Sequence, residues 1–237
     1  MGKIYETFLT ESLIVEDNHV VLAPKKEYKY RSVVSTPVEI VKYMVKNTLE
    51  PICQGKNPEE IQKLQIADIA CGSGVFLEEA YQFLIDYCVE WYMNYKPEYL
   101  VELSNGKRKL PLTDKKDILT KCIYGVDIDV HAVEVSKFSL LIKLIEDETP
   151  ASVMECVPIL PDLSSNIKNG NSLVSRDDIE SEAVTIEMLC DIKPFQWTEI
   201  NEGRKFDAII GNPPYVKTED IHTLETEAEF AVYKKKI

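Results

Sequence analysis

Residues 65–74 read Gln65-Ile66-Ala67-Asp68-Ile69-Ala70-Cys71-Gly72-Ser73-Gly74. The first six form a short apolar run typical of a buried strand, and an apolar-periodic stretch over residues 75–92 then predicts a helix. Between them, Gly72 and Gly74 can adopt backbone angles closed to other residues and let a ligand approach the backbone. Such a turn also occurs as a plain connection. After a first strand, however, it favours a nucleotide-type ligand at the start of the helix.

The same alternation of strand and helix continues on both sides of this unit. Strands are predicted over residues 122–128, directly before Gly170, and over 206–210, and helices over 130–145 and from Thr36-Pro37 to the residue before Pro51. Residues 93–116 carry turn signals and are interpreted as a loop or surface insertion. This pattern predicts an α/β domain with a mainly parallel sheet, whose ligands bind beyond the carboxyl ends of the strands.

The ends of the chain and its composition complete the expected organisation. Residues 5–13 have the spacing of a short amphipathic helix, so we divide the chain into a helical and extended segment over 1–30 and a domain over 31–237.

The 237 residues are 45% hydrophobic and 28% charged, as in soluble globular proteins. No apolar run is long enough to span a bilayer and no signal peptide is evident, so a cytoplasmic location is the default expectation. The six cysteines include no C-x-x-C pair, which favours reduced thiols over a zinc site.

Acidic residues follow the second predicted strand, in Gly125-Val126-Asp127-Ile128-Asp129. A carboxylate at this place can accept hydrogen bonds from both hydroxyls of a ribose, a role we assign to Asp127. Ile128 offers an apolar surface to an adenine ring. Asp129 directly precedes a predicted helix, which is the position of an N-cap.

The last predicted strand runs into Asn212-Pro213-Pro214-Tyr215. Two prolines stiffen the chain, and they fix the Asn212 side chain and the Pro213 carbonyl as acceptors aimed at one point. The lone pair of a base amino group is delocalised into the ring. Accepting both of its N–H bonds favours a tetrahedral nitrogen that can attack a methyl group, while Tyr215 stacks on the ring. The plain alternative is an Asn-Pro turn with a surface tyrosine.

These motifs occur in one order: Thr36-Pro37, then 68–74, Asp127, Asn171 and 212–215. The order resembles that of N6-adenine DNA methyltransferases, in type I methylation subunits and in fused type II restriction–modification enzymes. The start of the chain and residues 205–217 are also similar to that family, whereas 93–116 and 176–204 are not. The resemblance implies a Rossmann-like, S-adenosylmethionine-dependent methyltransferase fold. Because the family's sheet has further strands, we expect a fragment with an incomplete sheet that is inactive alone.

Residue by residue, the resemblance implies a cofactor site and a catalytic motif, with no metal. Thr36 and Pro37 would lie near the methionine end of the cofactor, where the preceding residues 32–35 lack the glycine and aromatic residues usual in the family. Asn171 stands where Asp is common, and its amide oxygen can still accept from an adenine amino group. The implied cofactor residues are Thr36, Pro37, Asp68, Ala70, Cys71, Gly72, Gly74, Asp127, Ile128, Asn171 and Ser172, and the catalytic ones are Asn212, Pro213, Pro214 and Tyr215.

The implied partner is double-stranded DNA, together with the rest of a parent protein or a specificity subunit, and no membrane. The formal charge of −13 conflicts with strong phosphate binding, although residues 25–31, 107–109 and 234–236 are locally basic. We therefore expect DNA affinity to come mainly from parts outside this chain. Three alternatives remain open: a protein glutamine methyltransferase of the release-factor type, an RNA methyltransferase, and a non-catalytic fragment for binding or assembly.

Overall fold

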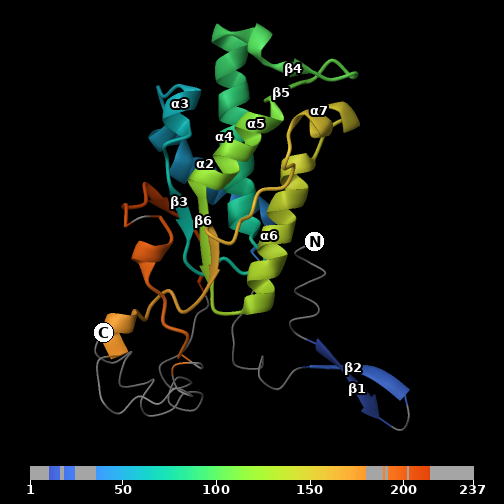
Figure 1. The fold of residues 1–237 in the computed structure, drawn as a ribbon. Coiled ribbons are helices and arrows are strands. Elements are labelled where there is room, and N and C mark those ends of the chain that lie inside the picture. Colours follow the sequence, from blue (N-terminus) through green and yellow to red (C-terminus); the bar gives the residue numbers. More distant parts are fainter. Residues whose placement is uncertain are drawn as a thin grey trace.

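A parallel sheet of four strands forms the centre of the computed structural model, which describes residues 11–16, 19–24, 36–179, 189, 192–201 and 203–213 (Figure 1). The strands are β3 (Ile66–Asp68), β6 (Ile123–Asp127), β7 (Ile167–Asn169) and β8 (Ala208–Ile209), in the spatial order β7-β6-β3-β8. All three neighbouring pairs run parallel. The prediction of an α/β domain with a mainly parallel sheet is confirmed.

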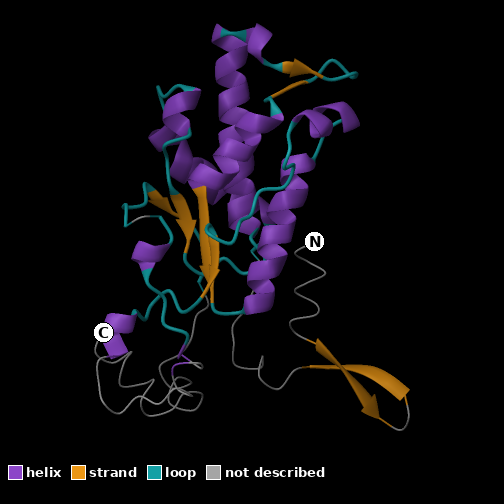
Figure 2. Cartoon of the chain, viewed as in Figure 1, coloured by secondary structure: helices purple, strands orange, loops and turns teal. Residues whose placement is uncertain are grey.

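Helices cover one face of this sheet (Figure 2). They are α2 (Val38–Cys53), α4 (Val75–Tyr95), α5 (Leu112–Cys122) and α6 (Val130–Ile145), with the short α3 (Pro58–Ile61) and α7 (Pro150–Glu155) beyond them. Their apolar residues share one buried core with Ile66 and Ile123. Successive strand residues face opposite sides, so Ala67, Tyr124 and Val126 pack instead on Phe195 and Ile200. Both faces of β3 and β6 are therefore buried, which explains why these two strands are apolar runs.

The carboxyl ends of the four strands meet at one edge of the sheet. In the register, Asp68 is the partner of Gly125, and Asp127 is the partner of Asn169. Each βα connection therefore delivers its polar residues to the same edge, as the sequence predicts.

The stretch 93–116 is more ordered than the interpretation as a loop allows. Helix α4 continues to Tyr95, a turn over Pro97–Tyr99 follows, and strands β4 (Val101–Glu102) and β5 (Arg108–Lys109) form a small hairpin. Helix α5 then begins at Leu112. Its buried face includes Lys115, and this charged residue obscured the apolar period in the sequence.

Two further predictions of element bounds are wrong. Pro51 does not end its helix but lies inside the last turn of α2. Residues 11–13 are not helical, because β1 (Glu11–Glu16) pairs with β2 (His19–Pro24) as an antiparallel hairpin. The β-branched residues on both sides of Asp17-Asn18 are a hairpin signal that outweighs the helical spacing. Residues 5–10 of the expected helix lie outside the described residues. In the part of the chain that is described, no helix has the length and apolarity needed to cross a membrane.

Candidate functional site at the carboxyl edge of the sheet

The glycine turn after β3 is held by its neighbours in a form that keeps its backbone accessible. Gly72 has a φ of +52°, and a Cβ placed on it would meet no atom within 4 Å. Gly74 has a φ of +87° and lies so close to α6 that a Cβ would be 2.5 Å from Ser136 Oγ. The two glycines thus serve different purposes. Gly72 borders open space, whereas Gly74 allows α6 to pack closely against the turn.

Asp127 fixes this turn to the second strand. Its Oδ2 accepts a hydrogen bond from the Gly72 N–H at 2.8 Å, and its Oδ1 accepts one from the Asp129 N–H at 2.8 Å. Asp129 accepts from the N–H of His131 at 2.8 Å, so it is the N-cap of α6, as predicted. Beside them Ile128 is 39% exposed, an apolar side chain at a polar edge.

Asp68 is the buried acid of the site, with 1% of its surface exposed. Its Oδ1 accepts from the Ala70 N–H at 3.0 Å. Burial raises the pKa of Asp68 to about 7, and the nearby Asp127 carboxylate adds to the shift against the opposing Ala70 hydrogen bond. Burial, followed by the two carboxylates, also raises the pKa of Cys71 well above its ordinary value, so this thiol stays protonated and is no nucleophile. A cation beside Asp68 and Asp127 would favour the ionised form of Asp68.

The third and fourth strands complete the edge. Asn171 is buried and its Oδ1 accepts from the Leu173 N–H at 3.1 Å, while Ser172 directly follows it. Asn212 Nδ2 donates to Thr36 Oγ1 at 3.1 Å across 176 positions of sequence. The structure therefore brings the Thr36-Pro37 segment to the Asn-Pro motif. Pro213 is exposed, and the predicted site residues Pro214 and Tyr215 lie outside the described residues.

Close contact between β3 and β8 at this edge depends on Gly211, a residue that the sequence analysis missed. A Cβ on Gly211 would lie 2.4 Å from Asp68 Oδ1. Asp68 therefore lies against the residue that directly precedes Asn212. A glycine directly before the Asn-Pro motif was the available signal, because glycine at a strand end often marks a close approach.

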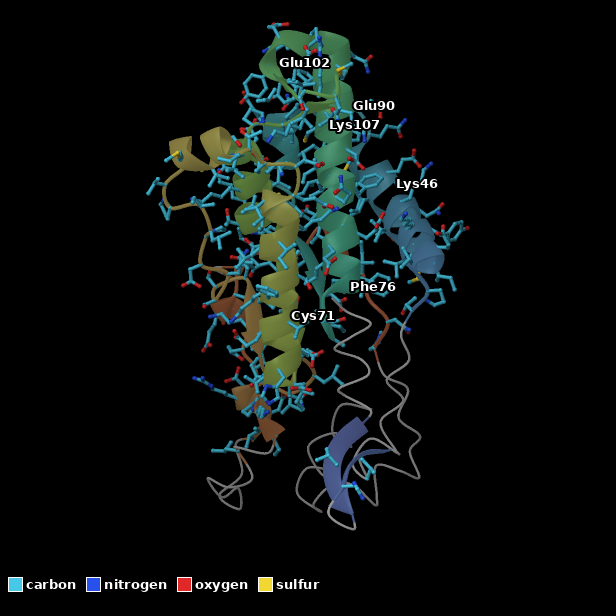
Figure 3. All side chains as sticks on the ribbon, turned by 90° about the vertical axis from the view of Figure 1, so that its right-hand side faces the viewer. Lys46, Cys71, Phe76, Glu90, Glu102 and Lys107 are labelled. Carbon is cyan, nitrogen blue, oxygen red and sulfur yellow. The ribbon has the colours of Figure 1, made fainter. Side chains whose placement is uncertain are left out.

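The basic residues 107–109 do not flank this edge. Helix α4 begins at the glycine turn and runs the length of the domain, and the β4–β5 hairpin follows its far end. Figure 3 shows Cys71 toward one end of the domain and Glu102 and Lys107 toward the other. Lys109 is paired with Glu148 there. The basic residues 107–109 therefore lie far from the candidate site.

Comparison with known proteins gives the family. A family model described as Eco57I restriction-modification methylase matches residues 121–237. These residues, just under half of the chain, are similar to that methylase family. The whole chain is 41% identical to the type II restriction enzyme and methyltransferase RM.Eco57I of Escherichia coli, of which it covers 23%. It is 30% identical over 195 residues to RM.MjaORFECS2P of Methanocaldococcus jannaschii, covering 66% of this chain and 16% of that relative.

These matches confirm the resemblance to restriction–modification methyltransferases, while the chain spans about a quarter of the length of its E. coli relative. A solved structure of a nuclease-deletion mutant of the Type ISP restriction-modification enzyme LlaGI, in complex with a DNA substrate mimic, is also similar. It has a TM-score of 0.46 and 17% identity, and the match covers 77% of this chain and 13% of that one. The fold of this chain is established by the order and register of its own strands.

Asp68→Asn is expected to stabilise the protein at neutral pH. The folded state holds the Asp68 proton more tightly than the unfolded state, so this carboxyl makes stability fall as pH rises from about 4 to about 7. Asparagine keeps the acceptor for Ala70 without that titration. In urea unfolding, the free energy of unfolding of the variant should rise relative to that of the wild type across this pH range, by an amount on the order of 4 kcal/mol. Asp86→Asn, on the outer part of α4, is the control. Parallel pH profiles of Asp68→Asn and wild type would contradict the raised pKa.

Proposed function

We propose that the protein is an S-adenosylmethionine-dependent DNA methyltransferase that acts on N6 of adenine. The observation that carries this proposal is the way in which the Asn212 side chain is hydrogen-bonded. Its Nδ2 is engaged with Thr36, and none of the described residues donates a hydrogen bond to its Oδ1. An oriented amide oxygen next to Pro213 is the arrangement needed to accept the N–H bonds of an amino group and so favour a nucleophilic nitrogen.

The glycine turn and its acids fit S-adenosylmethionine. The open space beside Gly72 accommodates a ligand against the backbone, and Ile128 offers an apolar surface to an adenine ring. Asp68 and Asp127 supply negative charge for a ligand that carries a sulfonium and an ammonium group. When bound, the cofactor supplies an electrophilic methyl group.

The chain's own residues perform three tasks in this proposal. Asp127 would accept from the ribose hydroxyls while it holds the glycine turn, and Asn171 and Ser172 would bind the adenine. Asn212 and the Pro213 carbonyl hold the target amino group, with Tyr215 stacking on a flipped base. The proton lost from the amino nitrogen becomes acidic once the methyl has transferred, so water can accept it without a strong general base. DNA is the proposed partner, bound largely through surfaces other than residues 107–109.

The test is the position of the transferred methyl group. The natural protein that carries these residues is incubated with duplex DNA and tritiated S-adenosylmethionine, and the DNA is digested to nucleosides. We expect the label in N6-methyldeoxyadenosine, because an Asn-Pro-Pro-Tyr motif suits an exocyclic amino group and the order of the motifs resembles that of N6-adenine methyltransferases. Label in cytosine, RNA or protein would overturn the assignment. The Asn212→Ala protein serves as the control for contaminating methylase.

A further inference from the structure

Residues 193–197 carry no motif that the sequence analysis singled out, yet they contact the carboxyl edge of the sheet. The matches to the methylase family and to RM.Eco57I include these residues, so excluding 176–204 from the resemblance was wrong. The Lys193 carbonyl accepts a hydrogen bond from the Asn171 N–H at 2.7 Å, and Lys193 Nζ donates to the Ile128 carbonyl at 3.0 Å. One residue therefore joins the loop after β6 to the loop after β7. Its φ of +49° is unusual for a lysine, and such backbone angles persist only where surrounding contacts impose them.

The loop after β6 has a second support. Asn169 Nδ2, at the end of β7, donates to the carbonyls of Asp127 and Ile128, both at 2.9 Å. The Ile128 carbonyl thus accepts from Asn169 and from Lys193. Two side-chain donors on one carbonyl fix the backbone that carries the Asp127 carboxylate and the exposed Ile128 side chain.

The loop after β7 is held by the rest of the same segment. The Phe195 N–H donates to the Val174 carbonyl at 2.8 Å, and Trp197 Nε1 donates to the Ser172 carbonyl at 2.9 Å. Phe195 also packs against Gly170, where a Cβ would lie 2.9 Å from Phe195 Cβ. Residues 171–174 are therefore bound along their length by residues 193–197.

We infer that residues 193–197 form a positioning clamp for the adenosine end of the cofactor, with Lys193 as the positioning residue that sets the spacing between Ile128 and Asn171. The inference rests on the proposed function, because it concerns the site proposed there for S-adenosylmethionine. Lys193 acts through the two loops. Its ammonium group fixes a backbone carbonyl, and its own carbonyl fixes the Asn171 backbone.

Lys193→Met in the natural protein that carries these residues tests the clamp, because methionine keeps most of the length of the side chain and removes the donor. The dissociation constants of S-adenosylmethionine and of 5′-methylthioadenosine, which lacks the amino-acid end, are measured by titration calorimetry. We expect both to rise by the same factor, about tenfold for loss of a charged donor. Lys193→Arg retains a donor and should restore most of the affinity. Lys205→Met removes an exposed lysine from the same region and should change neither constant.

Turnover and stability separate positioning from general damage. At saturating cofactor, kcat for Lys193→Met should stay within about twofold of wild type, because the lost donor affects binding and not the reacting atoms. Its melting temperature should match that of Lys205→Met. Unchanged affinity, a loss confined to S-adenosylmethionine, or a lower kcat without a change in binding would each overturn the clamp and leave the proposed function intact. A wild-type protein that binds neither ligand would overturn both.

Discussion

Asn212→Ala is expected to reduce the rate of methyl transfer by roughly 10²–10³, the cost of removing one preorganised hydrogen-bonding group from a reacting centre. The side chain lies at the carboxyl edge of the sheet and is oriented by Thr36. Its amide oxygen is the acceptor proposed to hold the target amino group. Alanine removes that acceptor and leaves the Pro213 carbonyl alone.

Cofactor affinity should stay within about twofold of wild type, because a group that acts mainly in the transition state lowers kcat without weakening ground-state binding. Single-turnover rates with duplex DNA and titration with S-adenosylmethionine measure the two quantities. Asn47→Ala, on the exposed side of α2, is the matched control and should change neither. Asn212→Asp keeps an acceptor oxygen and should lose less activity than alanine. An equal loss of affinity and rate in Asn212→Ala would show that residue 212 belongs to the cofactor site.

The candidate site could be proposed from sequence because most of its residues lie within short, local signals. The apolar run before Gly72 and the acids after the second strand specify two strand ends, and parallel pairing brings such ends together. The N-cap role of Asp129 is local as well, since its partner is two residues away. These features needed no knowledge of long-range contacts.

The features that sequence reasoning missed depend on contacts between distant residues. Helix α5 could not be recognised because Lys115 occupies its buried face, and the ion-pair partner of Lys115, Glu148, is 33 residues further along. The contacts of the proposed clamp also join distant residues, so they could not be predicted from sequence. Lys193 contacts Ile128 across 65 positions, within a stretch that shows neither helical nor strand period. The closeness of Gly211 to Asp68 likewise appears only when β3 and β8 are paired.

Glu148→Gln is expected to lower the free energy of unfolding by about 3–5 kcal/mol, because it removes the shared anion of a buried ion cluster. The Glu148 side chain is 1% exposed and accepts from Lys109, from Lys115 Nζ at 3.0 Å and from Ser152 Oγ at 2.7 Å. Without the carboxylate, the buried Lys115 ammonium keeps neutral acceptors, among them the Glu146 carbonyl at 3.0 Å. The charge of Lys115 then remains in the interior without an anion.

Calorimetry should show the melting temperature of Glu148→Gln falling by roughly 10 °C, given about 2–4 °C per kcal/mol for a chain of this length. Asp117→Asn breaks the exposed Lys121–Asp117 pair and should cost less than about 1 kcal/mol. Burial alone would raise the pKa of Glu148, but hydrogen bonds from Lys109, Ser152 and Lys115 outweigh it and lower that pKa. The unfolded state therefore binds the proton more tightly, and the contribution of Glu148 to stability is lost as pH falls below about 4.3.

Lys115→Met in the Glu148→Gln background separates charge from packing. Removing the buried ammonium together with its partner should recover part of the lost stability, because an apolar side chain carries no desolvation penalty there. Since Lys115 and Glu148 touch, the double variant should be more stable than the sum of the two single losses predicts. Additive losses, or a Glu148→Gln protein as stable as Asp117→Asn, would mean that the lysines reach water when Glu148 is removed and that the cluster does not hold α5 against the loop after α6.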